Sequence, residues 1–400
     1  MASEICRQLA ARTERELLEN ILPFWLEQAP DSERGGFWAR VSPDLTVHER
    51  SPRGLILTTR ILWTFAAVFR QYQNPACLEM ARKAYDEICS AFIDHQYGGA
   101  FWMLDANRQP LDDSKKIYGQ AFAIYSLVEY YAASGDTVAL EKALAVYKLI
   151  EKHNFDPLHT GYIESANRDW SPTAELRLSA VDMNEKKSMN THLHLLEAYT
   201  SLYKEWQDDG LRERLVSLVN NFLDHIIDNR SHHLILFFDE SWQPKSDKVS
   251  YGHDIETSWL LDEAAQLLAD PVLSRKCRKV SVAMAEAVLA EGVAADGGLD
   301  YERDGNGHPD HDVHWWVQAE SVVGFTNAYQ NTGRQEFLTA AVRAWDFIEE
   351  HLIDRTHGEW FYKVDGARRA DTQLHKISEW KCPYHNSRTC LELARRVEKY

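Results

Sequence analysis

The chain has 400 residues, of which 44% are hydrophobic, and a formal net charge of −17 at pH 7. That charge argues against nucleic acid or an anionic membrane as a partner. No apolar run approaches the roughly 18 residues of a membrane span. The six cysteines are scattered and include no Cys-x-x-Cys pair, which argues against a disulfide scaffold or a zinc ribbon. We expect a cytoplasmic protein with a neutral ligand.

Apolar residues recur at helical spacing in twelve segments of two alternating kinds. One kind, such as 76–95, is apolar along a single stripe and predicts a helix of an outer layer. The other kind, such as 55–74, is apolar nearly all round and predicts a buried helix. In chain order the expected helices span 4–28, 55–74, 76–95, 115–135, 137–153, 188–207, 211–229, 252–269, 272–291, 313–332, 334–352 and 379–398.

A short glycine–aromatic unit occurs six times, and a helix is expected after each copy. The copies are Gly36-Phe37-Trp38, Gly99-Ala100-Phe101-Trp102, Gly161-Tyr162-Ile163, Phe237-Phe238-Asp239, Gly298-Leu299-Asp300-Tyr301 and Gly358-Glu359-Trp360-Phe361. Measured between their aromatic residues, the steps are 64, 61, 76, 63 and 60 residues, and the fourth copy has no glycine. A near-constant period indicates one architectural unit used six times.

The sequence therefore predicts one all-α domain over residues 1–400. We expect an (α/α)6 barrel, with twelve helices in two concentric rings and short β-hairpins at one mouth. The aromatic loops gather at that mouth, where the function should lie.

One unusual polar residue marks each buried helix, again at the repeat spacing. These residues are Arg60, Tyr118, His194, His253, Glu320 and His385, separated by 58, 76, 59, 67 and 65 residues. We expect them on one level of the barrel, facing one another around its axis. Titratable groups at such depth are costly unless they pair or take part in chemistry.

Two of the histidines admit two interpretations each. In SYGHDIETSWLL, His253 is either a core histidine bonded to a carboxylate or a histidine whose basicity is tuned by Glu256 or Asp254. In EWKCPYHNSR, His385 belongs either to a capping cluster at a helix start or to a site.

His192, His194 and Trp316 also admit a structural and a functional interpretation. His192 and His194 are two residues apart, point to different helix faces and cannot chelate one metal, while Glu197 is placed to orient His194. Trp316 and Glu320 share a helix face, as in plain packing or in a carbohydrate site.

A third group resembles a metal motif only superficially. His308, His311 and His314 recur at a spacing of three, but neither cysteines nor a dense set of carboxylates accompanies them. We therefore expect no metal site. The sequence also has no Gly-x-Gly-x-x-Gly, P-loop or Gly-x-Ser-x-Gly motif, which argues against nucleotide cofactors and serine chemistry.

The chemistry favoured by these residues is acid–base catalysis near neutral pH, since two histidines lie on facing inner helices. Glycoside hydrolysis needs two carboxylates instead, and Glu256, Glu320 and Asp182 keep it as an alternative. The excess of histidines favours removal of a proton next to a carbonyl.

Four segments, SYGHDIETSWLL, MNTHLH, WW-x-x-AE and EWKCPYHN, carry a resemblance over essentially the full chain. Through them the sequence resembles the N-acylglucosamine 2-epimerase family, and within it the cellobiose 2-epimerases. The resemblance implies an (α/α)6 barrel, no cofactor and inversion of carbon 2 of the reducing-end glucose of cellobiose or a related β-1,4 disaccharide. The alternatives are a glucose/mannose 2-epimerase, an aldose–ketose isomerase and a non-catalytic sugar-binding barrel.

The resemblance also implies a role for each residue. After ring opening, His253 and His385 remove and return the proton on carbon 2 through a cis-enediolate, with His385 also opening the ring. His194 assists at the oxygens on carbons 1 and 2. The substrate-binding residues are Arg60 for the enediolate oxygen, Tyr118, Asn190 and Glu256 for hydroxyls or a histidine, Trp316 and Trp380 for stacking, Glu320 beside Trp316, and Asp182 for the second ring. We expect a sugar as the partner, and a monomer or homodimer.

Overall fold

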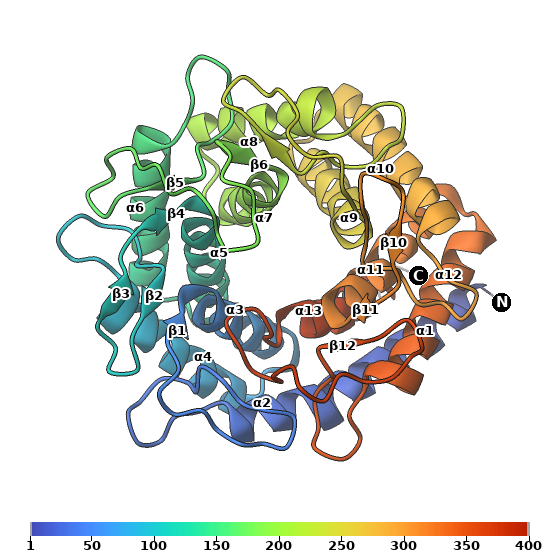
Figure 1. The fold of residues 1–400 in the computed structure, drawn as a ribbon, viewed down its shortest axis with the longest axis horizontal. Coiled ribbons are helices and arrows are strands. Elements are labelled where there is room, and N and C mark those ends of the chain that lie inside the picture. The colour runs from blue at the N-terminus through green and yellow to red at the C-terminus, as the bar shows by residue number, and fades with distance from the viewer. Residues whose placement is uncertain (1, 398–400) are drawn as a thin grey trace.

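Six helices form a closed inner ring in the computed structural model, which describes residues 2–397 (Figure 1). Each packs against the next, and the last returns to the first. Their side chains are buried over most of their length, as expected for helices that are apolar nearly all round. They are α3 (Leu55–Tyr72), α5 (Ile117–Ser134), α7 (Met189–Glu205), α9 (Tyr251–Leu267), α11 (Trp315–Thr332) and α13 (Tyr384–Val397).

The other helices surround this ring and bury one stripe each (Figure 1). Four of them contain a π-helical turn. They are α1 (Ala2–Glu16) with η1 (Leu17–Ile21) and α2 (Leu22–Gln28), α4 (Pro75–Glu87) with η2 (Ile88–Phe92), α6 (Thr137–His153), α8 (Asp209–Asn221) with η3 (Phe222–Ile226), α10 (Pro271–Glu291), and α12 (Gln335–Phe347) with η4 (Ile348–Leu352).

The predicted (α/α)6 barrel with two concentric rings is thus confirmed, with most helix ends within a few residues of those expected. The last helix begins at Tyr384 rather than 379, directly after Pro383, because a proline disfavours helical backbone in the residue before it. Its expected end at residue 398 lies outside the described residues, as do residues 1, 399 and 400 of the expected domain. Among residues 2–397, none of the helices combines the length and the apolar character that crossing a bilayer requires.

The turns that lead from inner to outer helices carry strong capping signals. The side chains of Asn74, Asp136, Asp208 and Asp270 accept hydrogen bonds from the first free backbone N–H groups of α4, α6, α8 and α10. These four caps recur at nearly the repeat period. Short polar signals therefore fix where each outer helix starts.

Short antiparallel strands lie at the mouth of the barrel, before the inner helices (Figure 1). Among residues 2–397 they form five small sheets, and the short β-structure predicted at one mouth is confirmed. The strands are β1 (Arg53–Gly54), β2 (Met103–Leu104), β3 (Pro110–Asp112), β4 (Lys115–Lys116), β5 (Ser165–Ala166), β6 (Lys187–Ser188), β7 (Phe237–Phe238), β8 (Val249–Ser250), β9 (Glu302–Arg303), β10 (Pro309–Asp310), β11 (Val313–His314) and β12 (Lys363–Val364).

The register expected for the fourth glycine–aromatic unit is wrong. In the first three units the carbonyl of the glycine accepts a hydrogen bond from an aspartate N–H, as Gly99 does from Asp94. In the fourth, the carbonyl of His233 accepts the matching bond from Asp228. The unit therefore lies at His233, and Phe237–Phe238 is the strand that follows it. The unit was assigned to the wrong residues because histidine replaces glycine at this position.

His192 provides a pH test of this architecture. Buried in α7, its Nδ1 contacts the carbonyl of Ser188 and its Nε2 accepts the Tyr162 N–H at 2.9 Å. Gln120 and Gln318 make the comparable backbone bonds in α5 and α11. Glutamine should therefore fit in place of His192.

We expect His192→Gln to fold normally and to resist acid better than the wild type. Burial lowers the pKa of His192 to about 3, so below the unfolded pKa of 6.5 only the unfolded chain takes up this proton. The wild type should lose about 2 kcal/mol of unfolding free energy relative to His192→Gln between about pH 6.5 and pH 5. Urea unfolding at the two pH values measures this, and parallel losses in both proteins would contradict it.

Candidate functional site

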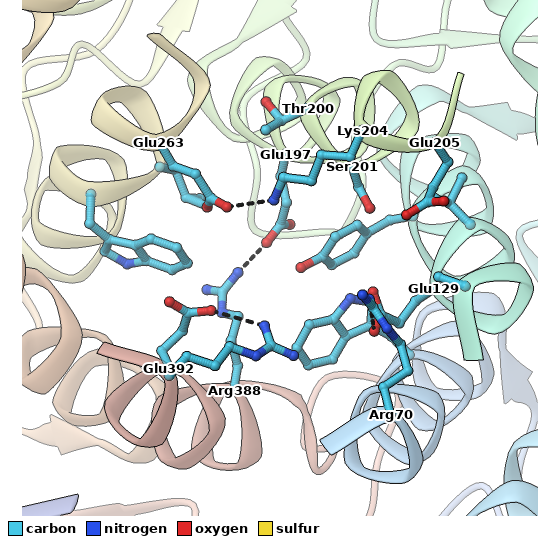
Figure 2. A pocket seen from close by; sticks show the side chains of 17 residues that line it. Arg70, Glu129, Glu197, Thr200, Ser201, Lys204, Glu205, Glu263, Arg388 and Glu392 are labelled. Carbon is cyan, nitrogen blue, oxygen red and sulfur yellow. Dashed lines mark hydrogen bonds and ion pairs between the residues drawn. The ribbon is translucent and has the colours of Figure 1, made fainter. Parts of the chain in front are cut away.

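Two cavities lie inside the inner ring, at opposite ends of its helices. The one at the C-terminal ends of the helices has a volume of ≈ 280 Å³. Ion pairs line much of it, including Arg70 with Glu129 and Lys204 with Glu263 (Figure 2). We call it the far cavity.

The other cavity, of ≈ 460 Å³, lies at the mouth, where the inner helices begin. We call it the mouth pocket. Ten of the eleven predicted site residues line it: Arg60, Tyr118, Asp182, Asn190, His194, His253, Glu256, Trp316, Trp380 and His385. Because residues from far apart in the sequence converge there, the mouth pocket is the candidate site.

The eleventh predicted residue, Glu320, lies behind the pocket rather than in its wall. It is fully buried, and one carboxylate oxygen is 2.7 Å from Nδ1 of His385. The other oxygen accepts a hydrogen bond from Nε1 of Trp259 at 3.0 Å. Glu320 is thus placed to hold His385 and not to contact a ligand.

The predicted single level of polar residues is also wrong. Arg60, His194 and Glu320 are the sixth residues of their helices, whereas Tyr118 is the second and His253 the third. Four residues of helix correspond to about 6 Å along the axis. The polar residues therefore occupy two levels, about one turn apart.

Each of the three pocket histidines has a partner at Nδ1. Nδ1 of His194 lies 3.0 Å from Oε2 of Glu197, which confirms the predicted orienting contact. With a carboxylate at Nδ1, His194 and His385 carry their proton on that nitrogen, which leaves Nε2 free to act as a base.

His253 differs from both interpretations of its motif. Its Nδ1 bonds the hydroxyl of Ser250 at 2.8 Å, and Asp254 instead bonds His233. The predicted tuning of His253 by Glu256 or Asp254 is therefore wrong. Both carboxylates lie on α9, but neither bonds the His253 ring.

The buried environment keeps two of the histidines neutral. Desolvation, aided by the charge of Arg60, lowers the pKa of His253 to about 3. Desolvation and the charges of Arg60 and Arg388 hold the pKa of His385 well below its usual value. Neutral imidazoles are the form that can accept a proton near pH 7.

The carboxylates around them are shifted in opposite directions. Burial raises the pKa of Glu256 to about 7, reinforced by the nearby Glu320. Burial would also raise the pKa of Glu197, but the charge of Arg388 and its contact with His194 bring it down to about 2. Glu197 is therefore ionised and is a strong acceptor for His194.

Arg60 supplies the positive charge of the pocket. Its guanidinium donates to the hydroxyl of Tyr118 at 2.9 Å and lies over the ring of Phe122, 4.4 Å from the centroid. Its Nε is buried and has no hydrogen-bond partner among residues 2–397.

Aromatic rings make up the rest of the wall. Trp316 contacts both His253 and His385, with ring centroids 4.8 and 5.6 Å apart. The ring centroids of Trp380 and Tyr118 are 6.1 Å apart. Asp182, in the loop before α7, is half-buried, lines the pocket and accepts hydrogen bonds from the backbone and hydroxyl of Ser179.

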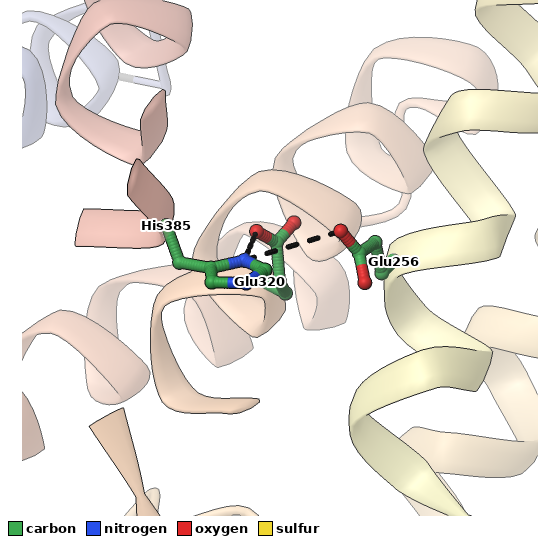
Figure 3. Close-up of side chains that lie close together, drawn as sticks. All are labelled: Glu256, Glu320 and His385. Carbon is green, nitrogen blue, oxygen red and sulfur yellow. Dashed lines mark hydrogen bonds and ion pairs between the residues drawn. The ribbon is translucent and has the colours of Figure 1, made fainter. Parts of the chain in front are cut away.

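One cluster in the described residues has the geometry of metal ligands. Atoms of Glu256, Glu320 and His385 lie within 4.8 Å of one another (Figure 3). Arg388 already bonds both carboxylates, however, and its charge opposes a cation. The histidines of the 308–314 segment bind separate partners: His308 contacts Asp304, and His311 contacts Asp300.

The sequence analysis missed two residues that shape the site. Ser250 directly precedes α9 and was not considered as a partner of His253. Arg388 stands in the EWKCPYHNSR motif but was not singled out. A charged residue one turn after His385, in a helix that is otherwise buried, was the signal that could have found Arg388.

Comparison with known proteins identifies the family to which this sequence is similar. Residues 36–387 match the family described as N-acylglucosamine 2-epimerase (GlcNAc 2-epimerase). The chain is 44% identical to a cellobiose 2-epimerase of Bacteroides fragilis over 388 residues, covering 96% of this chain and 98% of that protein.

Solved structures of related proteins have the same fold. The structure of cellobiose 2-epimerase from Bacillus thermoamylovorans is similar with a TM-score of 0.93 and 40% identity, covering 98% of this chain and 100% of that one. A D-mannose isomerase shares the fold with a TM-score of 0.84 at 22% identity, over 96% of this chain and 97% of that one.

Proposed function

This chain belongs to the N-acylglucosamine 2-epimerase family, and on that premise we propose the sugar and the residues with which it works. The chain is a sugar 2-epimerase, and so an isomerase. Its proposed reaction is the reversible inversion of carbon 2 of the reducing-end glucose of cellobiose, or of a related β-1,4 disaccharide, which gives the mannose epimer.

The observation that carries the proposed mechanism is the pair of neutral histidines in one pocket. His253 and His385 both contact Trp316, so a sugar lying against that indole lies close to both histidines. After ring opening, one histidine removes the proton on carbon 2 and the other returns a proton to the opposite face. His385, whose Nδ1 is held by Glu320, opens the ring and makes one of the transfers.

The intermediate of this reaction is a cis-enediolate, whose negative oxygen needs a donor. Arg60 lines the pocket with a buried guanidinium side chain, and His194 lines the same pocket. A buried guanidinium stabilises a developing negative charge strongly, because little water screens it.

The extent of the pocket supports a disaccharide. Trp316 lies beside His253 and His385. Trp380 and Asp182 line the pocket as well. Tyr118, Asn190 and Glu256 supply polar groups for hydroxyls. We place the reducing-end ring at the histidines and the second ring towards Asp182.

Glycoside hydrolysis is supported less well by this geometry. It needs one carboxylic acid and one carboxylate free to reach the scissile bond. Glu320 is fully buried and engaged on both oxygens. A glucose/mannose 2-epimerase or an aldose–ketose isomerase uses the same histidines and remains the alternative.

The proposed function is tested by incubating the protein separately with cellobiose, lactose, glucose and mannose in deuterated water. We expect the disaccharides to give their mannose epimers, with deuterium on carbon 2, faster than the monosaccharides react. A preference for glucose and mannose, or a ketose as the main product, would favour the alternatives. Monosaccharides released from cellobiose would indicate hydrolysis.

A further inference from the structure

Arg388 lies between the two cavities of the barrel. It belongs to α13, one turn beyond His385, and its side chain is almost fully buried. It lines the far cavity and not the mouth pocket (Figure 2). Arg388 therefore does not contact a sugar in the mouth pocket.

Three glutamates from three other inner helices bond this one guanidinium. Nη1 donates to Glu197, and Nη2 donates to Glu256 and, at 2.5 Å, to Glu320. Two of these glutamates hold the Nδ1 atoms of histidines. Glu197 holds His194, and Glu320 holds His385.

These contacts form two series, and both start at Arg388. One runs from Arg388 through Glu320 to His385, and the other runs through Glu197 to His194. Ionised carboxylates at Nδ1 fix both the tautomer and the ring orientation of an imidazole. The positive charge of Arg388 favours those ionised forms despite burial.

We propose that Arg388 is a positioning residue that holds two histidines of the mouth pocket in their reactive tautomer and orientation. Through Glu197 and Glu320 it keeps the proton of each ring on Nδ1 and leaves Nε2 bare towards the sugar. The part of this proposal that concerns catalysis rests on the proposed epimerase function.

A purely structural role is the competing explanation, because removing one member of a buried ionic cluster destabilises a protein. Arg388→Lys separates the two explanations. Lysine keeps the charge but presents a single ammonium group, which does not reproduce the planar fork that bonds carboxylates on three helices. We expect this variant to fold, to bind the sugar with a KM near that of the wild type, and to lose about 100-fold in kcat.

The pH profile gives a second readout. Loss of the guanidinium in Arg388→Ala removes a charge that holds the pKa of His385 down. The acid limb of kcat/KM should therefore move to higher pH in Arg388→Ala. Arg70→Ala is the matched control, because Arg70 also lines the far cavity but its guanidinium bonds Glu129, which contacts none of the pocket histidines. It should leave kcat and the pH profile unchanged.

The far cavity makes chemical rescue possible. Arg388→Ala opens space beside a cavity of ≈ 280 Å³ that the side chain already lines. Guanidinium, at concentrations too low to unfold the protein, should restore about 10-fold of the lost kcat by occupying that space. It should restore nothing in His385→Ala, which lacks the base itself.

The tautomers provide a test that is independent of activity. Nitrogen-15 NMR of histidine-labelled protein should show His194 and His385 protonated at Nδ1 in the wild type and as mixed tautomers in Arg388→Lys. Unchanged tautomers or a wild-type kcat in Arg388→Lys would overturn the proposal, and so would an unshifted acid limb in Arg388→Ala. So would a folded Arg388→Ala that guanidinium does not rescue. If the wild type epimerises no sugar, the proposed function fails while the NMR result still decides the role of Arg388.

Discussion

His385→Ala should lower the kcat for epimerisation by about 10³-fold and stop deuterium from entering carbon 2 of either epimer. His385 is the pocket histidine whose Nδ1 contacts a buried carboxylate and whose pKa lies well below its usual value. It is therefore a neutral base with Nε2 towards the pocket. If it also opens the sugar ring, no exchange is possible without it.

His253→Ala should give a different pattern. Epimerisation should again fall by about 10³-fold, because one face of carbon 2 loses its proton donor. Exchange should survive with only one of the two epimers, since His385 still serves the other face. The surviving epimer then shows which histidine serves which face.

Both results follow from proton NMR of carbon 2 in deuterated water, starting from each pure epimer. His311→Ala is a suitable control, because His311 contacts Asp300 outside the mouth pocket. If either pocket variant kept more than about a tenth of the wild-type rate, its assignment as an acid–base catalyst would be wrong.

Glu320→Gln should lower kcat by about 100-fold, with little change in KM. Glutamine keeps the shape of the side chain but loses the charge that holds the Nδ1 proton of His385. Glu320→Ala should in addition destabilise the fold by about 3–5 kcal/mol, because it removes one partner of Arg388 from a fully buried cluster.

Steady-state kinetics and urea unfolding measure these effects separately. Glu129→Gln is the matched control, because Glu129 is also a buried glutamate paired with an arginine, but at the far cavity. Wild-type kcat in Glu320→Gln would show that His385 needs no carboxylate. Release of monosaccharides from cellobiose that Glu320→Gln abolishes and His385→Ala does not would favour a hydrolase instead.

Much of the barrel was predictable, because its signals are local. The alternation of one-striped and fully apolar helices reports burial directly. Caps such as Asp136 and Asp208 mark where outer helices start. The fourth glycine–aromatic unit was misplaced because the carbonyl of His233 accepts the hydrogen bond that a glycine carbonyl accepts in the first three units. The residue type alone does not reveal that histidine and glycine occupy the same structural position.

The site was predictable as a set of residues but not as a set of contacts. Repeat spacing and the family resemblance together gave eleven residues, of which ten line one pocket. Helical spacing also predicted the contact of His194 with Glu197, because i, i+3 neighbours on a helix meet whatever surrounds them.

The ring of helices, the family and ten residues of the mouth pocket were predicted from the sequence. Three contacts became known only from the folded chain: Glu320 lies behind His385, Ser250 and no carboxylate holds His253, and Arg388 joins three glutamates. Those contacts cross between helices, so they depend on how each helix is rotated and on its level along the axis. Helical periodicity fixes that level only to within about one turn, or about 5 Å, which exceeds the length of a hydrogen bond.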